Sequence, residues 1–281
     1  METRVSSAKK EVIISDKRPA VLIGERINPT GKKRLAAALQ AGDLEIVRQE
    51  ALEQVQAEAD ILDVNVGAAG VDEAVLLPQV IQAVMDVVDV PLCIDSSKPK
   101  ALEAALKVYR GKPLINSVTG QDSSLSEVLP LVKEFNAAVI GLTMDDEEGI
   151  PKTADKRVSI AHKIVERAEA MGIPREDIII DCLNMPAAAD SKASLVIIEA
   201  IRRIKAELGV NMTLGGSNVS FGLPDRNLVN GVFLAIVLEA GVTCPVVDVA
   251  KIRPAVLATD ALLDRDMYMR RFILAYRKRN K

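Results

Sequence analysis

The stretch LCIDSS, from Leu92 to Ser97, begins with three apolar residues and then stops at a carboxylate, Asp95. A buried parallel strand is apolar along its length, and in a barrel its carboxyl end carries a polar side chain to the open mouth. Four other segments end in the same way: ILDVNVG with Asp63 and Asn65, PLINSVTG with Asn116, DIIIDCLN with Asp181, and MTLGGSNVS with Ser217 and Asn218. If these strands are neighbours in one sheet, their ends line one pocket that suits a neutral, hydrogen-bonding heterocycle.

The rest of the chain alternates between short apolar runs and longer segments whose apolar residues recur at helical spacing. The predicted strands are 20–24, 61–66, 92–94, 114–115, 137–144, 178–180, 212–215 and 246–249. The predicted helices are 44–58, 72–88, 99–109, 124–136, 154–171, 191–208 and 225–240, followed by a long last helix from Pro254. Parallel strands need helical crossovers, so this strict alternation predicts an α/β fold, a single (β/α)₈ TIM barrel with its site at the carboxyl ends of the strands.

One other architecture, a doubly wound open sheet, competes with the barrel. Such a sheet would carry a glycine-rich phosphate loop after its first strand, and GERINPTG at that place does not match the dinucleotide pattern. Residues 1–19 are polar and are expected to form an N-terminal arm or a loosely packed first segment. Residues 20–281 are expected to form the barrel, because no linker or low-complexity segment divides them.

The composition disfavours several classes of protein. With 36 Lys and Arg against 39 Asp and Glu, and only 2% aromatic residues, the chain has neither the basic field nor the stacking residues of a nucleic-acid binder. No apolar run approaches the roughly 20 residues of a membrane span, and the polar start METRVSSAKKE is not a signal peptide. The three cysteines are isolated in apolar segments, as buried thiols in a reducing compartment are. We therefore expect a cytoplasmic protein.

The residues after the strands restrict the chemistry. Zinc hydrolysis and serine–histidine catalysis are disfavoured, because the one histidine, His162, falls inside a predicted helix and there is no Cys/His cluster. A carboxylate pair acting as in glycosidases stays open, although aromatic residues on which a sugar could stack are scarce. The candidates at the strand ends are Glu25, Asn28, Asp63, Asn65, Asp95, Ser96, Asn116, Ser117, Asp145, Asp181, Asn184, Ser217, Asn218 and Asp248.

Six segments, in order on successive predicted strands, resemble one family. They are GERINPTG (24–31), LDVNVG (62–67), CIDSS (93–97), INS (115–117), IGLTM (140–144) and GGSNVSFGLPDRNLVN (215–230). Together they resemble the pterin-binding methyltransferases, which comprise methyltetrahydrofolate:corrinoid protein methyltransferases and the folate-binding domain of cobalamin-dependent methionine synthase. The resemblance runs from about residue 21 to the C-terminus.

The resemblance implies a role for each matching residue. Asp95, Asn116 and Asp181 match the pterin-binding residues of such enzymes, and Asn218 matches the asparagine that they place near N5 of the folate. Their chemistry agrees, because a carboxylate accepts hydrogen bonds from the amino group and ring N–H of a pterin, while an amide both donates and accepts. We expect Asn218, Asp95 and Asp181 to be catalytic, and the further substrate-binding residues to be Asp63, Asn65, Ser217, Arg226 and Glu25. Arg226 is expected to meet the distal carboxylates of the folate or the partner protein.

The resemblance also implies the reaction. The methyl group of 5-methyltetrahydrofolate leaves N5 readily only when that nitrogen gains positive character, so protonation of N5 beside Asn218 and nearby carboxylates lowers the barrier. An amide does not titrate usefully, so the proton comes from water or solution. The acceptor is the reduced cobalt of a corrinoid such as cobalamin, and a separate corrinoid protein is expected as partner. The sequence leaves the direction of transfer open.

Two rival functions remain. Dihydropteroate synthase shares the barrel and the pterin site, but that family ends with an Arg-x-His segment and carries a lysine on its seventh strand. Here the seventh strand reads TLGGSNVS, and no histidine follows His162. The other rival is a pterin-binding module without catalysis, which would bind folate without transferring a methyl group. Enzymes of the resembling family tend to be homodimers, and we expect the same state here.

Overall fold

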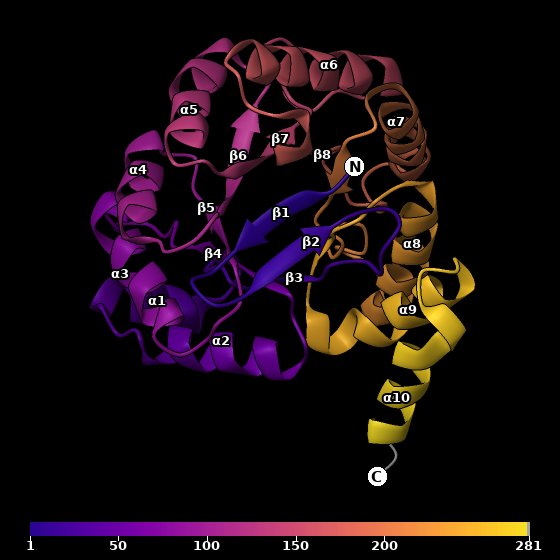
Figure 1. Cartoon of the computed structure of the whole chain (residues 1–281), viewed down its shortest axis with the longest axis horizontal. Coiled ribbons are helices and arrows are strands. Elements are labelled where there is room, and N and C mark those ends of the chain that lie inside the picture. The colour runs from indigo at the N-terminus through magenta and orange to yellow at the C-terminus, as the bar shows by residue number, and fades with distance from the viewer. Residues whose placement is uncertain (280–281) are drawn as a thin grey trace.

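The computed structural model describes residues 1–279, and at its centre lies an eight-stranded sheet in the order β10-β3-β4-β5-β6-β7-β8-β9 (Figure 1). All neighbouring strands are parallel. The two edges, β9 and β10, are joined beyond β9, where Gly215 forms a parallel bridge with Val246 and the Val246 N–H donates to the Leu214 carbonyl over 2.9 Å. The sheet therefore closes into the predicted barrel. The strands are β3 (Ile23–Ile27), β4 (Ile61–Asn65), β5 (Leu92–Asp95), β6 (Leu114–Thr119), β7 (Ala138–Leu142), β8 (Ile178–Asp181), β9 (Asn211–Thr213) and β10 (Val246–Val247).

Helices form a ring around the strands (Figure 1). Helix α7 illustrates why: its buried residues Ile197, Ile201, Ile204 and Leu208 recur every three or four positions, and the helix ends at Gly209 in the left-handed conformation. None of the helices formed by residues 1–279 is both long and apolar enough to cross a membrane. The helices are α1 (Lys33–Ala41), α2 (Glu45–Gln56), α3 (Glu73–Met85), α4 (Pro99–Val108), α5 (Asp122–Glu134), α6 (Ala154–Ala170), α7 (Ala193–Leu208), α8 (Arg226–Ala240), α9 (Val249–Leu262) and α10 (Arg270–Arg279).

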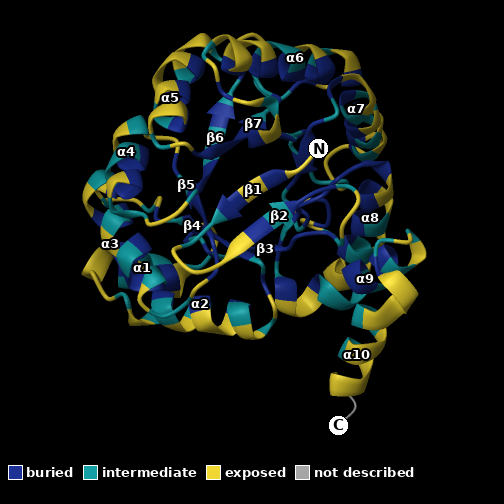
Figure 2. Ribbon diagram, in the orientation of Figure 1, coloured by how far each residue is buried: buried dark blue, intermediate teal, exposed yellow. Residues whose placement is uncertain are grey.

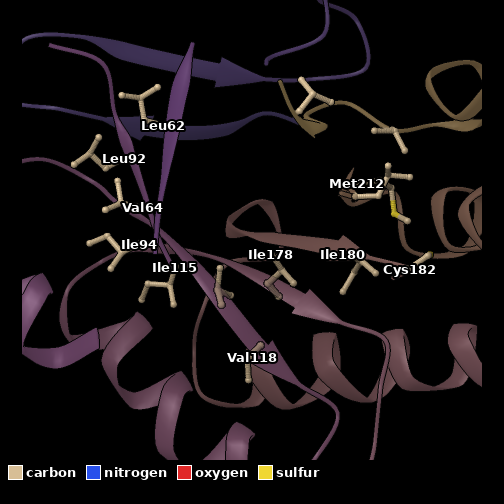
Figure 3. Close-up of a cluster of buried hydrophobic side chains, with 14 of the residues drawn as sticks. Leu62, Val64, Leu92, Ile94, Ile115, Val118, Ile178, Ile180, Cys182 and Met212 are labelled. Atoms are coloured by element: carbon tan, nitrogen blue, oxygen red, sulfur yellow. The ribbon is translucent and has the colours of Figure 1, made fainter. Parts of the chain in front are cut away.

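The barrel strands contribute to two apolar cores, because successive side chains point to opposite faces. The outer core lies between the strands and the helices and includes the strand residues labelled in Figure 3, such as Leu62, Ile94 and Ile180. The inner core fills the barrel and includes Ile23, Ile61, Cys93, Leu114, Ala138, Ile140 and Ile179. Figure 2 shows the resulting pattern, with buried strands at the centre and the surrounding helices exposed mainly on their outer faces, whereas α10 has no buried residue. Because the inner core fills the barrel, the polar residues at the carboxyl ends of the strands lie on top of it and face the barrel mouth.

The N-terminal segment forms a hairpin of β1 (Thr3–Ser6) and β2 (Glu11–Ile14) that packs across the barrel (Figure 1). Val5 and Ile14 are fully buried and belong to the inner core. The amide of Asn211 on β9 donates to the Thr3 hydroxyl over 2.9 Å and to the Ile14 carbonyl over 3.0 Å. The expectation of a loosely packed segment is therefore wrong, because this hairpin closes the end of the barrel opposite the strand-end residues. The division of the chain at residue 19 stays a prediction.

The boundary of the first barrel strand also differs from the prediction. It is β3, at 23–27 rather than 20–24, and the sequence GERI belongs to it instead of to a loop. The pairing of β3 with β4 shifts register between Gly24 and Ile27, so the strand accommodates two polar residues. Of these, Arg26 turns outward and pairs with Glu50 of α2, with Nη2 to Oε1 at 2.8 Å.

Two helical segments also differ from the prediction. Helix α1 occupies 33–41, where no helix was predicted, because only Leu35 and Leu39 of its residues are buried and the apolar signal is weak. The predicted last helix is two helices, α9 and α10. Pro254 lies inside α9 rather than at a helix start, and the chain turns between them with Tyr268 and Met269 at positive φ.

Candidate active site

Polar side chains from three adjacent strands form a row at the carboxyl end of the barrel. The parallel register pairs Asn65 of β4 with Asp95 of β5, and Asp95 with Asn116 of β6. Asp63 precedes Asn65 by two positions and so lies on the same inner face, one layer deeper. The structure thus brings together three of the five strand ends that the sequence predicted to converge.

Asn116 and Asp63 are hydrogen-bonded, with Nδ2 donating to Oδ1 over 3.1 Å. Burial raises the pKa of Asp63 to about 6, and the bond from Asn116 opposes that rise. Burial also raises the pKa of Asp95 well above its ordinary value, and the charge of Asp63 adds to this rise, while Asn65 opposes it. A ligand that offers N–H groups to Asp95 would stabilise the ionised form of its carboxyl.

Asp181 is the last residue of β8, two strands beyond Asn116 of β6 in the order of the barrel wall. Its Oδ1 accepts the backbone N–H of Leu183 over 2.6 Å. Burial raises the pKa of this carboxyl to about 7, against the opposing effects of that bond and of the Arg157 guanidinium. Arg157 is buried beneath the loop, where Nη1 donates to the Leu183 carbonyl over 2.9 Å. Asp181 is therefore held in place by its own loop, and burial favours the protonated form of its carboxyl.

The loop between β9 and α8 carries Ser217 and Asn218. The Ser217 hydroxyl donates to Glu25 Oε1 of β3 over 2.8 Å. Arg226 binds this loop from the first turn of α8: Nη2 donates to the Ser217 carbonyl over 2.9 Å and Nε to the Ser220 hydroxyl over 3.0 Å. These contacts hold the loop against the mouth of the barrel.

Asn218 is exposed, and its side chain lies over Gly215. A Cβ at position 215 would lie 3.0 Å from Asn218 Nδ2, so a side chain there would displace this amide slightly. The amide group is therefore available to a ligand in the barrel mouth.

Four other strand-end candidates have structural partners. Asn28 caps the turn to Thr30, Ser96 donates to Glu73 of α3 over 2.7 Å, and Asp145 accepts the backbone N–H groups of Glu147 and Glu148. Asn184 donates to the Gly215 carbonyl over 3.3 Å and so links the loops after β8 and β9. His162 lies on α6 and pairs with Glu207 of α7 over 2.8 Å, outside the site, as the sequence suggested.

Sequence reasoning missed two polar residues near Glu25. Lys32 is half-buried and donates to the Arg26 carbonyl over 2.8 Å, and burial lowers the pKa of its ammonium group. Asn230 is 6% exposed, and it lies on α8 facing the Glu25 side of the mouth. Nothing in a lysine after a glycine, or in an asparagine inside an apolar helix, marks these positions in the sequence.

Comparison with known proteins agrees with this geometry. A family model described as "Pterin binding enzyme" matches residues 24–248, which is most of the chain. The chain belongs to the pterin-binding enzyme family. It is 32% identical over 268 residues to the methylcorrinoid:tetrahydrofolate methyltransferase of Eubacterium limosum, covering 92% of this chain and 96% of that protein. This near-complete overlap confirms the family and the enzyme class inferred from the six motifs.

A longer relative and two solved structures extend the comparison. The chain is 32% identical over 266 residues to the methionine synthase of Mycobacterium leprae (strain TN), covering 90% of this chain but only 22% of that protein. Among solved structures, dihydropteroate synthase of Xanthomonas albilineans in complex with 7,8-dihydropteroate has a TM-score of 0.66 at 21% identity, covering 92% of this chain and 98% of that chain. The dihydropteroate synthase of Stenotrophomonas maltophilia has a TM-score of 0.69 at 21% identity, with the same coverage. At this identity the structures establish the barrel fold alone.

Proposed function

We propose that this protein transfers a methyl group between N5 of tetrahydrofolate and the cobalt of a corrinoid carried by a separate protein. The observation that carries the proposal is the arrangement of Asp95, Asn116 and Asp181 at one barrel mouth, with the exposed amide of Asn218 on the loop after β9. The 32% identical Eubacterium limosum relative, named for methylcorrinoid and tetrahydrofolate, supports it.

In the proposed complex the pterin ring lies in the mouth with its edge toward the row of acceptors. Asp95 accepts hydrogen bonds from the amino group and ring N–H, and Asn116 presents its carbonyl oxygen because its Nδ2 is already directed at Asp63. Asp181 binds the ring from the far side of the mouth. Asp63 supports Asn116, and Asn65 supports Asp95.

The chemistry requires positive character on N5. When methyltetrahydrofolate is the donor, Asn218 hydrogen-bonds to N5 and the carboxyls of the mouth favour the protonated amine, which is the better leaving group. The reduced cobalt then attacks the methyl carbon in line from the open side, and the C–N electrons stay on nitrogen. The same groups serve the reverse reaction. The name of the Eubacterium limosum relative, methylcorrinoid:tetrahydrofolate methyltransferase, leads us to propose that the physiological direction is from methylcorrinoid to tetrahydrofolate.

We also propose a homodimer. Leu228, Val232 and Ile236 of α8 are 62%, 54% and 41% exposed and lie four residues apart, so they form an apolar stripe on the outside of the ring. No charged residue interrupts α8 between Asn227 and Leu238. Replacing Val232 with glutamate should shift the mass measured by light scattering from dimer to monomer.

We propose a cytoplasmic location, with which the three buried free cysteines accord.

One spectroscopic experiment tests the function. Purified protein is mixed with methyltetrahydrofolate and photoreduced cobalamin, and the cobalt spectrum is followed; the reverse reaction starts from methylcobalamin and tetrahydrofolate. Wild type should interconvert the two cobalt species, and Asn218→Ala should lose at least about 100-fold in rate while still binding folate. Folate binding without any spectral change in wild type would contradict the proposal and favour a silent binding module. Formation of dihydropteroate would favour the synthase.

A further inference from the structure

Four carboxyl groups line one arc of the barrel mouth. They come from four strands that are adjacent in the sheet, in the order β10, β3, β4 and β5. Asp248 follows β10 directly, Glu25 lies in β3, and Asp63 and Asp95 lie in β4 and β5. The pterin-binding role proposed above uses the β4 and β5 end of this arc, and it leaves the other end without a function.

Glu25 occupies the middle of the arc and contacts the loop that carries Asn218. Its Oε1 accepts the Ser217 hydroxyl over 2.8 Å, and Ser217 is the residue next to Asn218. Burial raises the pKa of the Glu25 carboxyl, and the charge of Asp248 raises it further, while Ser217, Lys32 and Lys251 oppose the rise. The charged and titratable groups around Glu25 are Lys32 after β3, Asp63 on β4, Arg226 on α8, and Asp248 and Lys251 at the start of α9.

A cavity of about 340 Å³ opens beside Glu25 on the side away from the pterin row. Two of its lining acceptors, Oδ1 of Asn230 and Oδ1 of Asp248, are buried and have no hydrogen-bond partner within residues 1–279. The other oxygen of Asp248 is bound by Lys251 Nζ over 2.7 Å. The cavity reaches the surface, since the exposed residue Asn227 also lines it. Such a polar space with unpaired acceptors suits hydrogen-bonded water, which can carry protons.

We propose that Glu25 is a proton-relay residue, passing protons between solvent in this cavity and N5 of the folate by way of the Ser217 hydroxyl beside Asn218. The inference rests on the proposed function and answers what that function leaves open, namely the source of the proton. Glu25 acts through Ser217, so it is a positioning residue for the proton rather than a group that touches the substrate.

The proton balance is the same in both directions. With methyltetrahydrofolate as donor, the Glu25 carboxyl releases its proton, N5 gains it, and Glu25 regains one from the cavity after the methyl group has moved to cobalt. With methylcorrinoid as donor, N5 of tetrahydrofolate bonds to the methyl carbon and loses a proton, which Glu25 accepts as a carboxylate. The forward rate should therefore fall as pH rises through the pKa of Glu25, and the reverse rate should rise.

The test compares pH profiles of kcat at saturating folate in both directions, with free cobalamin as the methyl carrier. Glu25→Gln should lower kcat about 100-fold at pH 7 and abolish the change in kcat that accompanies titration of Glu25 in the pH profile. Its Kd for folate should stay within threefold of wild type. Asp248→Asn removes the neighbouring charge that raises the pKa of Glu25, so it should move this change in kcat to lower pH. Glu53→Gln, the same change on the outer helix α2, should leave rate and profile as in wild type.

The outcomes separate this inference from the proposed function. An active wild type together with a Glu25→Gln variant that keeps its rate and pH profile would overturn the relay and leave the methyltransferase intact. An inactive wild type would overturn the function itself. If Glu25→Gln melts below the assay temperature, Ser217→Ala replaces it, and a Ser217→Ala variant with an unchanged pH profile would equally overturn the relay.

Discussion

Asn116 of β6 donates a hydrogen bond to Asp63 of β4 over 3.1 Å, so a single bond reaches across the width of β5 and past Asp95. Because this bond uses the amide nitrogen, it fixes which end of the Asn116 amide faces a ligand. It also opposes the rise in the pKa of Asp63. Asp63, Asp95 and Asn116 therefore form one hydrogen-bonding surface rather than three independent side chains.

The Asn116→Ala variant should bind 5-methyltetrahydrofolate about 10- to 100-fold more weakly at pH 7.5, which is the loss expected for one or two hydrogen bonds in a charged network. The variant loses a direct contact, and Asp63 loses the donor that favours its ionised form. Isothermal titration calorimetry measures the change. Thr119→Ala serves as control, because Thr119 lies on the same strand and bonds to Gln121 instead. A Kd within twofold of wild type for Asn116→Ala would remove the residue from the pterin site.

The sequence predicted the strand ends well, because a buried parallel strand has a simple signature. An apolar run that stops at a carboxylate predicted that Asp95 and Asp181 end their strands, and both do. The order of the motifs then predicted the barrel. To predict contacts between neighbouring strand ends, it was enough to assume that the strands belong to one sheet.

Other features depended on contacts between distant parts of the chain. The Ser217 to Glu25 bond joins residues 192 positions apart, and it forms only because barrel closure brings β3 beside β10. The hairpin of β1 and β2 has four residues in each strand, too short for a periodic signal, and its partner Asn211 lies on β9. Such contacts follow from register and closure, which local patterns do not encode.

Asp181 should make stability depend on pH in a defined direction. Folding raises its pKa from an ordinary value of 3.8 to about 7, so the stability associated with its protonated form is present below about pH 4 and is lost as pH rises through 7. Asp181→Asn keeps an acceptor for the Leu183 N–H and carries no charge. The free energy of unfolding of this variant should therefore exceed that of wild type by about 1–3 kcal/mol at pH 8. The difference should shrink toward zero at pH 4.

Urea denaturation at the two pH values measures this effect, and Asp155→Asn, at an exposed position on α6, controls for removal of a surface charge. Equal stability of wild type and Asp181→Asn at pH 8 would mean that the native carboxyl is solvated as well as in the unfolded chain. The same substitution should weaken folate binding, since a carboxylate accepts N–H groups with both oxygens and an amide with one.

The hairpin offers a matched pair of neighbouring residues on β2. Ile14 is fully buried in the inner core and Ile13 is only partly buried on the opposite face. Ile14→Ala should cost about 2–5 kcal/mol of unfolding free energy, as large-to-small core substitutions do, and Ile13→Ala less than about 1.5 kcal/mol. Chemical denaturation measures both. Similar losses for the two variants would show that the hairpin does not seal the barrel.

Arg226 distinguishes a structural role from a substrate contact. Its guanidinium is bound to the Ser217 carbonyl and the Ser220 hydroxyl, and it lies 6.0 Å from the ring centroid of Phe221, so the structure favours a role in holding the loop that carries Asn218. Arg226→Met should then lower the methyl-transfer rate about tenfold, the effect of losing a hydrogen bond or two that position the amide. The Kd for folate should change little.

A truncated substrate separates the two roles of Arg226. A 5-methyltetrahydropterin without the aminobenzoyl-glutamate tail has no distal carboxylates, so a loop-holding arginine predicts the same tenfold rate loss with this substrate as with methyltetrahydrofolate. If Arg226 instead binds the tail, wild type and variant should react equally fast with the truncated substrate. Arg202→Met is the control, because Arg202 makes an ion pair with Glu239 on the outside of the ring and does not touch the loop. Its rate should match wild type with both substrates, so that any loss in Arg226→Met is assigned to the loop beside Asn218.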